Sequence, residues 1–264
     1  MPEYTSHPPG TFSWPELSTS DQQAGVAFYR SLFGWDVNEQ PAGPGMTYSI
    51  FQMRGKEVAA AAGQRPEETQ QGVPPHWNSY VSVANADDAV KRAQSLGGKV
   101  LAPAFDVMDV GRMAVLQDPT GAVFQVWEAK KHIGAKILQE PGALTWTELA
   151  TNDTETAKKF YTSLFGWKEK TSSGSGMTYT EYSVNDRPQA GMMAMNEQMK
   201  SMHVPPNWLP YFQVTDVDAT ANKAKELGAM LFVPPADIPN TGRFSVIRDP
   251  QGAVFAIYKP APRA

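Results

Sequence analysis

Two glutamates are the residues of this sequence with the clearest potential for chemistry, and each follows a tryptophan by two positions. Glu16 lies in Trp14-Pro-Glu-Leu-Ser-Thr-Ser-Asp21, and Glu148 lies in Trp146-Thr-Glu-Leu-Ala-Thr-Asn-Asp153. These segments alternate in the manner of strands, so each glutamate shares a face with its tryptophan while the following leucine faces away. A carboxylate on an inward strand face is costly to desolvate unless it is hydrogen-bonded or paired. Burial raises the pKa of such a group and suits it to proton transfer, so Glu16 and Glu148 are the predicted catalytic residues.

The same two glutamates also have a structural interpretation. Each could accept hydrogen bonds from backbone donors or from an arginine of its own half of the chain, for which Arg112 and Arg243 are the candidates. The strand alternation also places Phe12 on the face of Trp14 and Glu16. Because a structural role and a catalytic role would both keep the Trp–Glu pair in each segment, both interpretations stay open.

The Trp–Glu pair recurs because the whole chain is a tandem duplication. Ordered matches run through it: Phe28-Tyr-Arg-Ser-Leu-Phe-Gly-Trp35 with Phe160-Tyr-Thr-Ser-Leu-Phe-Gly-Trp167, and Asp118-Pro-Thr-Gly-Ala-Val-Phe124 with Asp249-Pro-Gln-Gly-Ala-Val-Phe255. Chance does not produce so many matches in the same order. We call the halves copy one and copy two, and expect domains at residues 1–128 and 144–264 joined by a linker at residues 129–143.

Each copy is expected to contain two βαβββ modules, which gives an α+β fold with four modules in the chain. In copy one, a strand at 12–17 precedes Asp21, which is suited to cap a helix over 22–33 that ends at Gly34. The remaining expected elements are strands around 46–53 and 57–62, a strand from Tyr80, a helix over Asp87–Leu96, and strands around 99–102, 112–117 and 122–128. The segment Pro103–Asp106 is expected to form a lid loop.

The composition favours an ordinary globular protein without a polyanionic partner. The net charge is −4, and the 23 Lys and Arg residues are scattered rather than gathered in the cationic stripe that nucleic-acid binding requires. No stretch approaches the roughly 18 apolar residues of a membrane span, and the first ten residues do not resemble a signal peptide. We therefore expect a cytoplasmic protein, a monomer or homodimer, with no nucleic-acid or membrane partner. The absence of cysteine excludes thiolate metal sites and cysteine nucleophiles.

The chain resembles the vicinal-oxygen-chelate superfamily, which includes glyoxalase I, bleomycin-resistance proteins and extradiol dioxygenases, and within it a two-domain bacterial type. Three features carry the resemblance: the strand–Asp–helix run that ends Phe28-Tyr-x-x-Leu-Phe-Gly-Trp35, the helix that ends Leu96-Gly-Gly, and the hairpin Asp118-Pro-x-Gly-x-x-Phe124. They recur over essentially all of both copies. The resemblance implies cupped sheets whose concave faces hold a small molecule, and it implies that Trp14 and Glu16 point into the cup.

Metal-dependent members of this superfamily hold a divalent cation with His, Gln or Glu side chains. The resemblance assigns the ligand positions to Trp14, Asn78, Gln125 and the strand at 57–62 in copy one, and to Trp146, Leu209 and Ala256 in copy two. A catalytic divalent site needs about three imidazole, carboxylate or comparable donors. No metal and no other cofactor is therefore predicted. His76 is the one residue through which a shifted alignment would restore a metal ligand.

The cup is instead expected to be lined by aromatic rings with a few polar groups, as small-molecule sites generally are. The predicted ligand-binding residues are Trp14, Tyr48, His76, Asn78, Tyr80, Arg112, Gln125 and Trp127 in copy one, and Trp146, Tyr179, Tyr211, Arg243 and Tyr258 in copy two. Copy one keeps more polar donors, so we expect it to be the more active half.

Three functions fit these residues. The first is an enzyme of glyoxalase or hydroxylase/dioxygenase type that acts on a small carbonyl or aromatic compound, with the glutamates as proton-transfer groups. The second is a metal-free protein that binds or sequesters a flat apolar ligand between aromatic faces. The third is an interaction protein whose cups no longer bind anything.

Overall fold

The structure is a computed structural model that describes residues 3–43, 45–174 and 177–262. Copy one forms β1 (Phe12–Thr19), α1 (Gln22–Phe33), β2 (Asp36–Gly43), β3 (Met46–Met53), β4 (Lys56–Gly63), α2 (Pro66–Gln70), β5 (His76–Ser82), α3 (Ala86–Ser95), β6 (Lys99–Val107), β7 (Gly111–Gln117) and β8 (Val123–Ala129). Copy two forms β9 (Leu144–Thr151), α4 (Thr154–Phe165), β10 (Lys168–Gly174), β11 (Met177–Val184), β12 (Arg187–Ala194), α5 (Glu197–Ser201), β13 (Asn207–Gln213), α6 (Val217–Glu226), β14 (Met230–Ile238), β15 (Gly242–Arg248) and β16 (Val254–Pro260).

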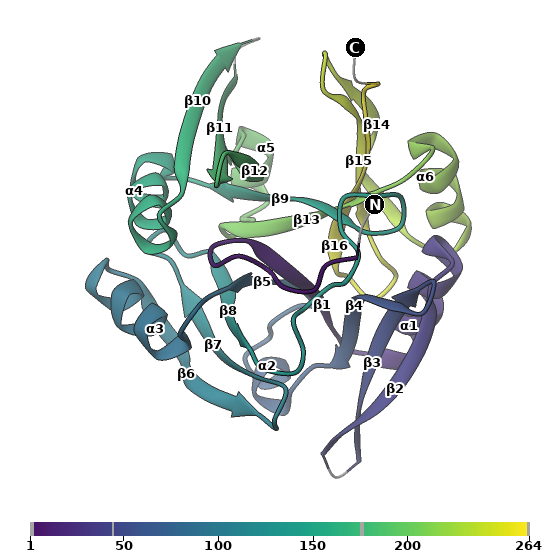
Figure 1. Ribbon diagram of the computed structural model, residues 1–264. Helices are drawn as coiled ribbons and strands as arrows, with labels where there is room; N and C mark the ends of the chain where they lie inside the picture. Colours follow the sequence, from purple (N-terminus) through teal and green to yellow (C-terminus); the bar gives the residue numbers. More distant parts are fainter. Residues whose placement is uncertain (1–2, 44, 175–176, 263–264) are drawn as a thin grey trace.

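Each copy builds one eight-stranded mixed sheet. The strand order is β2-β3-β4-β1-β5-β8-β7-β6 in copy one and β10-β11-β12-β9-β13-β16-β15-β14 in copy two. Two βαβββ modules thus join at β1–β5 and at β9–β13, where the strands run antiparallel. In Figure 1 the two sheets curve in opposite directions, with copy one below and copy two above. The predicted α+β class and four-module organisation are confirmed.

The long helices begin and end where the sequence predicts. The Asp21 side chain accepts a hydrogen bond from the Ala24 N–H at the start of α1, and Gly34 ends the helix in the left-handed conformation. Asp153 and Gly166 do the same for α4. These caps satisfy backbone groups that the helix itself leaves unpaired. No helix among the described residues is long and apolar enough to cross a membrane.

Two expectations about copy one are wrong. Phe12 does not share the face of Trp14, because a β-bulge lies between them: Phe12 pairs with Val81 but Trp14 pairs with Tyr80. The extra residue reverses the side-chain alternation and sends Phe12 into the core on the helical side. The segment Pro103–Asp106 is not a lid loop, because it belongs to β6. That strand is at the sheet edge, where a proline costs no ladder hydrogen bond on its open side.

The two copies share their cores on the helical side of the sheets. One core joins α1 of copy one to Phe212, Phe255 and the α6 face of copy two, and the other joins α4 to Phe124 and the α3 face. In Figure 1, α1 accordingly lies beside α6 and α3 beside α4. Each of these cores contains residues of both copies. The predicted division of the chain into two separate domains therefore stays a prediction.

A buried hydrogen-bond relay fastens each shared core. The Tyr29 hydroxyl donates to Asp249 Oδ2 across the copies at 2.9 Å and accepts from Trp77 Nε1 at 2.9 Å. Tyr161 repeats the arrangement with Asp118 and Trp208, at 2.8 Å in both bonds. The Phe-Tyr dipeptide of each helix therefore packs into a shared core, and its tyrosine also links the two copies, which the sequence pattern did not reveal.

Candidate functional site

The concave face of copy one holds Glu16 in a network of side-chain donors. Its Oε2 accepts from the Tyr48 hydroxyl at 2.6 Å, and its Oε1 accepts from the Tyr80 hydroxyl at 3.0 Å. Tyr48 in turn accepts from Trp14 Nε1 at 3.0 Å. Asn78 Nδ2 adds a longer bond of 3.4 Å to Glu16. Three strands supply these groups: β1 carries Trp14 and Glu16, β3 carries Tyr48, and β5 carries Asn78 and Tyr80.

Copy two repeats this hydrogen-bond network around Glu148, but without a counterpart to the Asn78 amide. Glu148 Oε2 accepts from the Tyr179 hydroxyl at 2.8 Å, and Oε1 accepts from the Tyr211 hydroxyl at 2.8 Å. Trp146 Nε1 donates to Tyr179 at 2.9 Å. The matching position to Asn78 is Leu209, which pairs with Glu148 across the strands. Among the described residues, the two tyrosines are thus the hydrogen-bond donors to this carboxylate.

Burial raises the pKa of both glutamates, and the tyrosine hydrogen bonds oppose that rise. Removal of water disfavours the charged carboxylate, whereas hydroxyl donors favour it. The pKa values of Tyr48, Tyr80 and Tyr211 are raised for the same reason, together with repulsion from the neighbouring carboxylate. These tyrosines therefore remain neutral donors, and each glutamate is a partly buried acceptor on a concave face.

The suggested arginine partners are wrong. Arg112 donates to Asp87 at 2.9 Å and lies 3.4 Å from Asp106, and Arg243 donates to Asp218 at 2.7 Å and to Asp237 at 3.0 Å. Both guanidiniums tie the start of a helix to the outer strands, where an exposed aspartate is available at little desolvation cost. A ligand-binding role for Arg112 and Arg243 stays a prediction without support from this geometry.

The remaining polar residues of copy one form a second cluster beside Glu16. Gln125 Nε2 donates to Asn78 Oδ1 at 2.6 Å, and His76 Nε2 lies 3.2 Å from the same oxygen. His76 Nδ1 contacts the Pro74 carbonyl at 2.9 Å. His76, Asn78 and Gln125 therefore come together as expected, whereas copy two has Asn207, Leu209 and Ala256 at the matching positions.

The residues at the implied metal positions do not fit a divalent cation. Copy one offers an indole and two amides that bond to each other, and Ala60 stands on β4 opposite Glu16. Copy two offers Trp146, Leu209, Ala256 and, opposite Glu148, Gly191. Within the described residues there is no group of three or more His, Cys, Asp or Glu side chains placed to hold a metal ion. A carboxylate alone on each face does not supply the donor set that such sites use.

The linker contributes to the cup of copy one a residue, His132, that was not among the predicted site residues. The His132 ring meets the Trp14 ring edge-on at 4.7 Å between centroids, and its carbonyl accepts from Trp127 Nε1 at 2.8 Å. Burial lowers the pKa of His132, although Glu57 nearby opposes the change. Burial therefore favours the neutral form of the imidazole that sits against the predicted aromatic wall. The sequence signal was weak, because a lone histidine in a linker has no periodicity to interpret.

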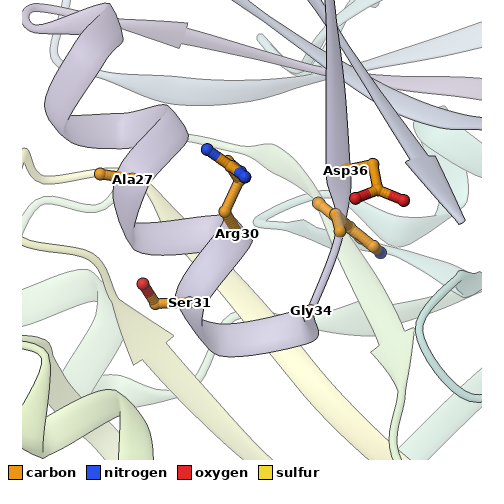
Figure 2. Close-up of a pocket in the computed structure, with 6 residues that line it drawn as sticks. Ala27, Arg30, Ser31, Gly34 and Asp36 are labelled. Carbon is orange, nitrogen blue, oxygen red and sulfur yellow. The ribbon is translucent and has the colours of Figure 1, made fainter.

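A separate surface depression of about 430 Å³ lies at the end of α1 (Figure 2). It is lined by Ala27, Arg30, Ser31, Gly34, Trp35 and Asp36. None of the predicted site residues lies in it. A second depression of about 400 Å³ lies at the ends of β14, β15 and β16, beside Gly242 and Arg243.

Comparison with known proteins agrees with this architecture. The family model described as "Glyoxalase/Bleomycin resistance protein/Dioxygenase superfamily" matches residues 11–126 and 143–257. The chain is 41% identical over 265 residues to "Putative glyoxylase CFP32" of Mycobacterium tuberculosis, with 100% of both chains covered. It is 36% identical to "Anthracycline biosynthesis protein DauV" of Streptomyces sp. strain C5, covering 96% of this chain and 94% of the relative.

Solved structures share the fold at low sequence identity. The Mn(II)-bound glyoxalase from Novosphingobium aromaticivorans has a TM-score of 0.67 at 15% identity, covering 95% of this chain and 82% of that one. The 2,3-dioxygenase LapB from Pseudomonas sp. KL28 has a TM-score of 0.65 at 13% identity, covering 96% and 93%. At such identities the likeness concerns the fold, and the chemistry depends on the site residues.

Proposed function

The chain belongs to the glyoxalase/bleomycin resistance protein/dioxygenase superfamily, and from that premise we propose that it binds a flat, neutral, hydroxyl-bearing aromatic molecule on a concave face without a divalent metal. The observation that carries the proposal is the carboxylate held by two tyrosine hydroxyls beside an indole, which occurs in both copies. An aromatic face beside a directed acceptor is suited to a ring that carries a donor.

The glutamate carboxylate is the reason for expecting a hydroxyl group on the ligand. An ionised carboxylate has about four lone-pair positions, and the tyrosines of copy two occupy two of them. A ligand hydroxyl would add a further charge-assisted hydrogen bond to a group that burial has deprived of water. An anionic ligand would instead be repelled by the same charge. The relative named for anthracycline biosynthesis adds support, because anthracyclines are planar polycyclic aromatic compounds with hydroxyl groups.

The test is a calorimetric titration of metal-depleted protein with 2-naphthol and with 2-methoxynaphthalene. The two compounds have the same ring system, but only 2-naphthol donates a hydrogen bond. We expect 2-naphthol to bind and its methyl ether to bind at least tenfold more weakly, and the difference to disappear in the double variant Glu16→Gln/Glu148→Gln. Equal affinity of the two compounds for the unaltered protein contradicts the proposal.

A second candidate function is proton abstraction next to a carbonyl group, as in glyoxalase-type chemistry. The raised pKa of Glu16 and Glu148 favours it, because a general base works best with a pKa near the working pH. An assay with methylglyoxal and a thiol would compare the unaltered protein with Glu16→Gln and Glu148→Gln. Activity that is equal in all three proteins excludes the glutamates as the base.

A further inference from the structure

We propose that copy two provides the ligand-binding cup, which takes one flat neutral aromatic molecule with a hydroxyl group, and that linker residues 132–138 close the corresponding cup of copy one. This assignment rests on the proposed function. It adds which copy binds the ligand, how many ligand molecules bind per chain, and the structural reason for both. It reverses the expectation that copy one is the more active half.

The aromatic walls of the two cups differ in exposure. In copy one Trp14 is 4% exposed, Met113 8% and Trp127 7%. Their counterparts Trp146, Phe244 and Tyr258 are all partly exposed. Strand pairing places each set on the concave face, because Trp146 pairs with Tyr211 and Phe244 pairs with Tyr258. The wall that a flat ligand would need is therefore accessible in copy two and covered in copy one.

The linker is what covers copy one. The Ala135 N–H donates to the Ser13 carbonyl at 2.8 Å, and the Lys136 N–H donates to the Glu57 carbonyl at 2.8 Å. The segment is thus hydrogen-bonded to β1 and β4 at once, where those strands no longer pair with each other. Gly134 permits the close approach, because a Cβ there would lie 2.5 Å from the Ser13 oxygen and its φ is +104°.

His132 occupies the place that a ligand ring would take. Its imidazole stands edge-on to Trp14 at 4.7 Å and to Trp127 at 6.0 Å. Aromatic rings attract one another in this geometry at these distances. In the part of the chain that the structure describes, no aromatic ring contacts Trp146 in this way. Copy one therefore carries its own internal ring, and the described residues of copy two show no counterpart to it.

The side chains in the cup of copy two suit a largely apolar ligand that has one hydrogen-bond donor. Leu209 and Ala256 stand near Glu148 where copy one has the amides Asn78 and Gln125. On the neighbouring strand β12, Gly191 lies opposite Glu148. The Glu148 carboxylate is then the charged acceptor of a face that has neither of copy one's amides at these two positions. In copy one Asn78 already adds a third donor to Glu16, which leaves less acceptor capacity for a ligand.

A first experiment needs no ligand. Six of the seven tryptophans are 7% exposed or less, and Trp146 is the partly exposed one. We expect limited oxidation with N-bromosuccinimide, followed by peptide mass spectrometry, to modify Trp146 first. His132→Ala should make Trp14 reactive while Trp146 is unchanged. Oxidation of Trp14 before Trp146 in the unaltered protein overturns the assignment.

The second experiment is a calorimetric titration with 2-naphthol, using isosteric variants that match between the copies. We expect one site per chain, a loss of affinity of at least tenfold in Glu148→Gln that exceeds any loss in Glu16→Gln, and a second site in His132→Ala. Near-ultraviolet circular dichroism checks that each variant is folded. Two equal sites in the unaltered protein, or loss through Glu16→Gln alone, overturns the assignment but leaves the proposed function in place. Absence of binding in every folded protein overturns the proposed function itself.

Discussion

At the residue scale, each cup holds one glutamate carboxylate between two tyrosine hydroxyls. The tyrosines stabilise its charged form, and the loss of water destabilises it more. Such a group titrates at a higher pH in the folded chain than in the unfolded chain. Folding stability therefore depends on whether Glu148 is protonated, and this dependence can be measured.

We expect Glu148→Gln to alter how stability changes with pH. Because the folded pKa is raised above the usual value of 4.5, the neutral carboxyl contributes its full stability below about pH 4.5. That contribution is lost as the pH rises through the folded pKa. The free energy of unfolding of the native protein should thus fall relative to that of the glutamine variant from pH 4.5 upward. Urea unfolding of both proteins between pH 4.5 and 8 measures this difference, and other titrating groups cancel in it. If the free energy of unfolding of the native protein instead rises with pH relative to that of the glutamine variant, the pKa of Glu148 is depressed in the folded chain.

Much of the site was predictable at this scale because strand alternation is a strict rule. Trp14, Glu16, Asn78, Tyr80 and Gln125 meet on one face as the period-two pattern requires. The hydroxyl partners were not predictable as partners, since Tyr48 reaches Glu16 from β3, two strands away. The arginine expectation failed because opposite charge alone does not say which carboxylate an arginine will reach.

At the element scale, β12 approaches the network of copy two more closely than a side chain allows. A Cβ at Gly191 would lie 1.7 Å from the Tyr179 hydroxyl and 2.9 Å from Trp146 Nε1. The tyrosine occupies that space in order to bond with both Trp146 and Glu148. The glycine of β12 is therefore part of the site although it carries no functional group.

Gly191→Ala should displace Tyr179 and break the relay. Overpacking of this kind costs about 1–3 kcal/mol, and we expect a loss of that size in the free energy of unfolding together with weaker 2-naphthol binding. Gly174→Ala on β10 is the matched control, because nothing lies within 4 Å of the added carbon. Thermal and urea unfolding measure both variants. Equal stability of the two variants would show that Tyr179 is free to move without cost.

Elements were predictable wherever local chemistry defines their ends. Capping residues defined α1 and α4, and hydrophobic alternation defined the central strands. The bulge at Phe12 and the extended course of Pro103–Asp106 were not predictable, because both depend on the pairing partner rather than on the segment itself. The position of the linker against β1 and β4 is likewise a tertiary contact without a local pattern.

At the scale of the whole molecule, the duplication produces two cores that each need both copies. Tyr29 and Trp77 of copy one meet Asp249 of copy two in one core, and Tyr161, Trp208 and Asp118 meet in the other. The copies should therefore unfold together.

Tyr29→Phe tests this coupling. It removes the donor to Asp249 and the acceptor for Trp77, and each buried group left unsatisfied costs about 1–3 kcal/mol. We expect a lower unfolding midpoint with one transition that coincides in tryptophan fluorescence and far-ultraviolet circular dichroism. Tyr4→Phe, which removes a hydroxyl from the ring that stacks on His7 and takes no part in the relay, serves as the control. Two separated transitions in the native protein would mean that the copies fold independently.

The central claim is that the aromatic wall and the tyrosine-held carboxylate bind a hydroxyl-bearing ring without a divalent cation. The most direct measurement is the affinity for 2-naphthol before and after exhaustive chelation, with the metal content determined on the same samples. The predicted result is an unchanged dissociation constant in metal-depleted protein and after readdition of Mn²⁺, Zn²⁺ or Ni²⁺. Loss of binding on chelation, restored by one of these ions, would contradict the account.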